Sequence, residues 1–220
     1  MIKLENTEVV GWEHAIRGMR NPLNSWEKSD SGYKCPYHST KETVCLGCKE
    51  NMCIGQNDHD LMTRLRNAGT DHRKFMRMIT VYVDITAPLY WWKEFDTYKV
   101  GTVANSCSTM HKIHEKEFTL DDFSHEHLDR FSTEVLGWTI KALNGSREDY
   151  MKSKSKDDWW QMIQLLPSSY NQRRTIDLNF EVLLKQYRER KNHKLDEWHI
   201  YCDWIKEIVL LNEIIKKYGY

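Results

Sequence analysis

An alternating run of apolar residues followed by a proline constrains the fold of this chain more than any other feature. Every second residue from 75 to 85 falls on one face: Phe75, Arg77, Ile79, Val81, Val83 and Ile85. Period-two alternation of β-branched and aromatic residues predicts a β-strand. Thr86 is expected to cap a following helix, and Pro88 to occupy its first turn, where the missing N–H costs least.

A polar segment follows the predicted helix. Its hydroxyl, amide and amine groups belong to Thr97, Tyr98, Lys99, Thr102, Asn105, Ser106, Ser108 and Thr109. Loops held by a packed strand and helix often carry binding residues. A loop that only contacts solvent has the same composition, so the sequence leaves both interpretations open.

Helical and strand patterns continue along the chain. Apolar residues at helical spacing predict helices over 9–20, 58–67, 128–143, 159–166, 180–187 and 195–209. Asn57 or Asp58 is expected to cap the second of these, and 144–146 to end the third. A capping box is predicted from Thr119 to Asp122, and a short strand at 173–178. The predicted fold class is α+β: one helix-rich domain over 1–220 with a small, mainly antiparallel sheet.

Composition narrows the class of protein. Lys plus Arg and Asp plus Glu both number 32, so no global field favours nucleic acid or an anionic membrane. We find neither a signal-peptide pattern nor an apolar stretch of membrane-spanning length. The sequence therefore predicts a cytoplasmic protein whose six cysteines are thiols or metal ligands.

A cysteine-rich insertion is predicted at about 26–57. It holds two ligand pairs, Cys35-x-x-His38 and Cys45-x-x-Cys48, with Cys53 as a fifth candidate. Pairs with two intervening residues suit tetrahedral zinc, because both side chains can approach one ion. Free thiols in a surface loop are the alternative. A structural rather than a catalytic zinc is the prediction.

Several motifs together resemble flavin-dependent thymidylate synthases. They are Asp71-His72-x-x-Phe75, Asp84-Ile85-Thr86-Ala87, Thr97-Tyr98-Lys99-Val100-Gly101-Thr102, Leu166-Pro167, Asn179-Phe180-Glu181, Arg190 and Glu197-Trp198. The resemblance covers most of the chain except roughly residues 26–57 and 112–155. It implies a homotetramer that binds FAD, takes electrons from NADPH, and methylates dUMP with methylenetetrahydrofolate. The flavin would carry the hydride chemistry, so the catalytic residues are left unassigned.

The resemblance also assigns candidate binding residues. Cofactor contacts fall on His72, Lys99 and Thr102. Contacts to a pyrimidine deoxynucleotide fall on Ser106, Ser108, Glu181 and Arg190.

The chain departs from the family where an Arg-His-Arg motif is expected. Thr97-Tyr98-Lys99 stands there, or Asp96-Thr97-Tyr98 with a shift of one, and Glu181 replaces an arginine. A lysine lacks the planar fork with which arginine binds phosphate. Two alternatives to dUMP methylation are therefore open. One is an inactive nucleotide-binding protein; the other is an enzyme for a different pyrimidine, since Glu181 could accept a hydrogen bond from a cytosine-type amine.

Overall fold

The structure is a computed structural model that describes residues 1–33 and 52–208. It confirms the predicted α+β class. One antiparallel sheet has the strand order β1-β4-β6-β5. Its strands are β1 (Lys3–Val10), β4 (Thr80–Pro88), β5 (Thr102–Ser106) and β6 (Asn171–Asn179). The helices are α1 (Trp12–Arg20), α2 (Gln56–Asn67), α3 (Leu89–Phe95), α4 (Arg130–Ser153), α5 (Lys156–Leu165), α6 (Phe180–Arg190) and α7 (Asp196–Glu207). None of the helices in the described ranges is long and apolar enough to cross a membrane.

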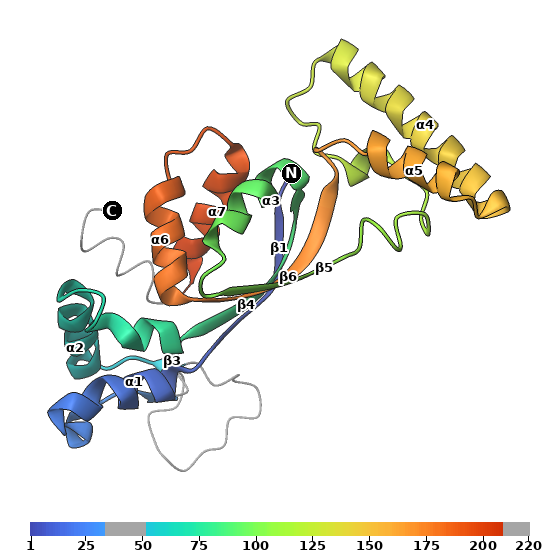
Figure 1. The fold of residues 1–220 in the computed structure, drawn as a ribbon. Coiled ribbons are helices and arrows are strands. Elements are labelled where there is room, and N and C mark those ends of the chain that lie inside the picture. Colours follow the sequence, from blue (N-terminus) through green and yellow to red (C-terminus); the bar gives the residue numbers. More distant parts are fainter. Residues whose placement is uncertain (34–51, 209–220) are drawn as a thin grey trace, which may run out of the picture.

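Alternation along the two central strands separates a buried face from a polar one. Val81, Val83 and Ile85 of β4 are buried, as are Ile176 and Leu178 of β6. Figure 1 shows α3, α6 and α7 packed together beside the sheet, α1 and α2 at one end, and α4 with α5 as a hairpin that extends from the other end. A second hydrophobic cluster lies in that hairpin and the segment before it.

The predicted strand at 75–85 is wrong in its first half. Arg73–Met78 forms a 3-10 helix, η3, and β4 begins at Thr80. Phe75 and Met76 are both buried although they are neighbours in sequence. A strand would direct them to opposite faces of the sheet, whereas the helical turn allows both to pack into the same core.

The end of β4 also differs from the prediction. Thr86 does not cap a helix, because it pairs in the sheet with Lys3 and with Arg173. The following helix begins at Leu89, with Pro88 as its N-cap residue. The polar segment after it is not a plain loop: a 3-10 turn, η4 (Asp96–Tyr98), leads into β5, which pairs with β6.

Strand β1 was not predicted. Most of its side chains are exposed, since it lies at one edge of the sheet, and its sequence alternates poorly. The helix predicted from residue 9 begins instead at Trp12.

Helix α4 continues past the predicted break at 144–146, as far as Ser153. The Asn144 side chain accepts from the Phe118 N–H at 2.8 Å and donates to the Phe118 carbonyl at 2.9 Å. Asn144 thus serves a tertiary contact instead of ending the helix. The charged composition of 151–158 predicts a connector, but the segment spans the end of α4 and the start of α5.

The predicted apolar face of α4 is largely exposed. The helical spacing of Phe131, Val135, Trp138 and Leu143 predicts that they are buried. The first three are instead 73%, 50% and 76% exposed, and only Leu143 is buried. Helical spacing places the first three on one face, which no described residue covers.

The two ends of the cysteine-rich insertion are fixed to α1 and α2. A short hairpin, β2 (Gly32–Tyr33) with β3 (Met52–Cys53), joins them. Asp30 accepts hydrogen bonds from the N–H groups of Asn57 and Asp58, while Gly55 is the N-cap residue. The cap predicted at Asn57 or Asp58 is therefore wrong, and Asp30 satisfies the first turn from outside α2.

Several local predictions are confirmed. Thr119 and Asp122 form the reciprocal capping box around a 3-10 turn, η5 (Leu120–Asp122). Strand β6 contains the predicted 173–178. Helix α6 is amphipathic and buries its apolar face, and α7 buries Trp198, Cys202 and Ile205. Val209 lies outside the described residues.

Candidate functional site

A pocket of about 560 Å³ lies between η3 and α6. It is lined by Thr70, Arg73, Glu181, Leu184, Lys185, Arg188 and Glu189. Its volume falls in the range of small-molecule sites, and its lining holds three basic and two acidic residues, an excess of one positive charge. A pocket of this size and charge suits a ligand with an anionic group.

Glu181 forms one wall of this pocket. Its carboxylate lies 2.8 Å from Arg73 Nε and 3.4 Å from Arg77 Nε. Asn179 caps the helix by accepting from the Val182 N–H at 3.1 Å, which places Glu181 in the first turn, where the helix dipole favours a carboxylate. Both carboxylate oxygens therefore face arginines from η3.

The segment with Lys99 and Thr102 approaches the same helix end. Gly101 has a φ of 83°, and a Cβ there would lie 3.0 Å from both Asn179 Nδ2 and Val182 Cγ2. Only glycine permits this approach without strain. Thr102 donates its hydroxyl hydrogen to the Tyr98 carbonyl at 2.7 Å. Lys99 is exposed, and none of the described residues pairs with it.

Arg190, predicted to bind the nucleotide, is engaged inside the protein. Its Nη1 lies 2.6 Å from Glu94 Oε2, and its Nε donates to the Tyr98 hydroxyl at 2.9 Å. The guanidinium also lies 4.8 Å from the centre of the Trp198 ring. The same Glu94 oxygen accepts from Trp198 and lies 3.0 Å from His193 Nε2. This network neutralises Arg190.

Tyr98 occupies the centre of the segment aligned with Arg-His-Arg, and it is buried. Burial raises the pKa of its hydroxyl to about 12; Arg190 opposes the rise and Glu189 adds to it. The hydroxyl therefore stays protonated near neutral pH, and it donates to Glu189 at 2.8 Å. At this position the chain has an internal hydrogen-bonding group in place of an exposed cation.

Ser106 and Ser108 lie at the opposite end of β5 from the pocket. Ser106 pairs with Arg174, whereas Thr102 pairs with Leu178 next to α6. At about 3.3 Å per residue, the strand separates Thr102 and Ser106 by roughly 13 Å. Ser108 accepts from the N–H groups of Met110 and His111 in a local turn. One copy of the chain does not bring these serines to the pocket.

His72 is exposed at the start of η3, directly before Arg73. Of the seven residues that line the pocket only Glu181 was predicted as a site residue; the basic residues Arg73, Lys185 and Arg188 were not, and neither was Arg77, which contacts Glu181. The signal available for Arg73 and Arg77 was the basic segment 72–77, but the predicted strand began at Phe75, so it excluded Arg73 and grouped Arg77 with the apolar face. The candidate zinc ligands Cys35, His38, Cys45 and Cys48 lie outside the described residues. In 1–33 and 52–208, no group of His, Cys, Asp or Glu is arranged to hold a metal ion.

Comparison with known proteins identifies the fold. No protein-family model matches the chain, and no curated protein sequence matches it significantly. Two crystal structures of the flavin-dependent thymidylate synthase ThyX from Helicobacter pylori, both with FAD and dUMP, are similar to it. They superpose with TM-scores of 0.64 and 0.63 at 15% and 16% identity, covering 93% and 94% of this chain and 92% of theirs. The chain therefore has the fold of flavin-dependent thymidylate synthases.

Proposed function

We propose that this protein binds FAD and a pyrimidine deoxynucleotide, and that it methylates dUMP with methylenetetrahydrofolate and NADPH. The observation that carries the proposal is the basic pocket between η3 and α6, on a fold shared over nearly the whole chain with ThyX. When bound, the flavin supplies the hydride chemistry. The donor set fits an anionic group, because Lys185 is an exposed cation in the pocket lining, and Lys99 is an exposed cation two residues before Gly101, which lies against the start of α6.

Residue roles follow from this arrangement. Arg73 and Arg77 fix Glu181, and Lys185 offers a cation to a phosphate. Thr102 and His72 present polar groups near the same helix end, consistent with their proposed cofactor contacts. Ser106 and Ser108 are proposed to contact the nucleotide of a neighbouring subunit, because they lie at the far end of β5.

The visible spectrum of the purified protein tests this proposal. We expect a flavin spectrum after FAD is added and excess removed, with a further change on addition of dUMP. A protein that stays colourless after FAD addition contradicts flavin binding. Formation of dTMP with NADPH and methylenetetrahydrofolate would establish turnover.

Replacing Lys99 with alanine should weaken FAD or dUMP binding about tenfold, because a charge-assisted contact to a phosphate is lost. Isothermal titration of both ligands measures the change. Lys116→Ala, at an exposed lysine between β5 and α4, is the control and should leave both affinities unchanged. Equal affinity of K99A and the natural protein would remove Lys99 from the site.

A binding protein without turnover is the second candidate function. The engagement of Arg190 by Glu94 and Tyr98 favours it, since this cation is not free for a phosphate. Flavin and dUMP binding with no dTMP formed would identify this alternative. Titration with dCMP tests the other pyrimidine: tighter binding of dCMP than of dUMP would support recognition of an exocyclic amine by Glu181.

Assembly into a homotetramer is also part of the proposal. The exposed face of α4 supports it, because Phe131, Val135 and Trp138 form an apolar stripe larger than scattered surface residues explain. We expect a mass of four chains by light scattering, and a lower mass for Phe131→Ser with Trp138→Ser. A natural protein that is monomeric at micromolar concentration contradicts this expectation.

The predicted zinc is retained as a proposal for the insertion. Metal analysis of protein purified without chelator should find about one zinc per chain. Absence of zinc would leave the cysteines as free thiols.

A further inference from the structure

A second cavity, of about 280 Å³, lies between α1 and the stem of the insertion. It is lined by Glu13, Ile16, Arg17, Arg20, Trp26, Ser29, Ser31, Gly32 and Met52. None of these residues lines the pocket beside α6. The cavity is therefore separate from the proposed nucleotide site.

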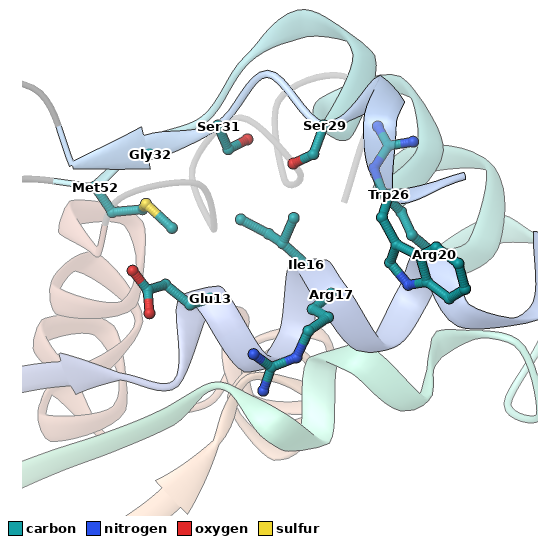
Figure 2. A pocket seen from close by; sticks show the side chains of 9 residues that line it. All are labelled: Glu13, Ile16, Arg17, Arg20, Trp26, Ser29, Ser31, Gly32 and Met52. Atoms are coloured by element: carbon teal, nitrogen blue, oxygen red, sulfur yellow. The ribbon is translucent and has the colours of Figure 1, made fainter. Parts of the chain in front are cut away.

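The body of this cavity is apolar and its framework is fixed. Ile16 projects into its centre, and Met52 lies across from it (Figure 2). Trp26 is half exposed at one end, and its indole N–H donates to Asn21 at 2.8 Å, which fixes the ring. Ser29 and Ser31 are bound to Asp58 and to the Gly55 N–H, so the opposite wall is also fixed.

Three charged residues line this cavity: Glu13, Arg17 and Arg20. Figure 2 shows the Glu13 carboxylate directed toward Met52, whereas Arg17 points away from Ser29 and Ser31. Arg20 is buried, and Asp58 neutralises it at 2.6 Å. Within the described part of the chain, no cation pairs with Glu13. The cavity thus combines an apolar body, an aromatic end and one unpaired carboxylate.

We propose that this cavity binds a small primary amine with an apolar stem. The ammonium would lie at Glu13, and the stem would pass over Ile16 and Met52 toward Trp26. Glu13 is exposed at the edge of the cavity, where its carboxylate attracts a cation and can accept charge-assisted hydrogen bonds from an ammonium group. The small volume restricts the ligand to about the size of one large side chain.

Titration with 2-phenylethylamine, followed by the indole N–H signals in ¹H–¹⁵N spectra, tests this inference. The amine is protonated at pH 7, as lysine is. We expect saturable shifts of the Trp26 signal, assigned from Trp26→Phe. The neutral analogue 2-phenylethanol should bind at least tenfold more weakly. Equal binding of the two probes, or no shift at Trp26, would overturn the proposal.

Matched variants separate the role of Glu13 from an effect on folding. Glu13→Gln should weaken binding of the amine about tenfold and leave binding of 2-phenylethanol unchanged. Glu8→Gln, the same change at an exposed carboxylate of β1 outside the cavity lining, should leave the affinity for the amine unchanged. Full affinity in E13Q would reject the carboxylate as the recognition group. Flavin and dUMP binding should be unaffected in E13Q, which keeps this test independent of the proposed function.

Discussion

Replacing Asp58 with alanine should lower the free energy of unfolding by about 3–5 kcal/mol, the usual cost of breaking a buried ion pair. Asp58 is fully buried, and Arg20 is only 3% exposed. The carboxylate also accepts from the Ser29 hydroxyl at 2.8 Å and from the N–H groups of Asp30 and Ser31. Alanine leaves the buried guanidinium without its counterion. Urea denaturation followed by circular dichroism measures the loss.

Asp60→Ala is the control on the same helix. Asp60 is exposed and should change stability by less than about 0.5 kcal/mol. A loss in D58A no larger than in D60A would show that the pair does not stabilise the fold.

Asp58 also predicts a pH dependence. Burial alone would raise its pKa, but hydrogen bonds from Ser31, Ser29 and Arg20 outweigh burial and lower it. A carboxyl whose pKa is lower in the folded state contributes its full stability above its unfolded pKa and loses it as the pH falls toward the folded value. Unfolding free energy should therefore decrease below about pH 4 in the natural protein. In D58A the decrease should be smaller.

Replacing Trp91 with alanine should cost about 3–5 kcal/mol as well, because it leaves a large cavity in the core. Trp91 is fully buried at the centre of an aromatic cluster. Its ring centre lies 4.8–5.5 Å from those of Trp92, Phe95, Trp198 and Tyr201. Thermal and urea unfolding should both show the loss.

Trp91→Phe is a matched variant for this position. The indole N–H of Trp91 has no hydrogen-bond partner in the described structure, so phenylalanine removes no satisfied hydrogen bond. W91F should lose much less stability than W91A. Trp26→Ala, at a half-exposed ring, should cost less than about 1 kcal/mol. Similar losses in W91A and W26A would contradict a packed core around Trp91.

The sequence by itself determined the elements in which the spacing of apolar or capping residues shows the local structure and the buried face. Alternation in β4 after residue 79, the helical spacing of Phe180, Leu183, Leu184 and Tyr187, and the capping box at Thr119 all appear in the structure as predicted. Each depends on neighbours within a few residues, so spacing alone is sufficient evidence. The motif order also predicted the fold that the comparison identified.

Only the tertiary structure decided the edge strands, the exposed face of α4 and the site. Strands β1 and β5 form because β4 and β6 supply hydrogen-bond partners for their backbone groups. The residues of β1 and β5 themselves do not show that these partners are present. Arg190 is neutralised by Glu94, 96 residues earlier in the chain, so its engagement could not be predicted from α6 alone. The pocket beside α6 likewise requires η3, whose helical turn places Arg73 and Arg77 against Glu181. Burial of one face is encoded locally, whereas the partner of each charge and each strand edge depends on which distant segments meet.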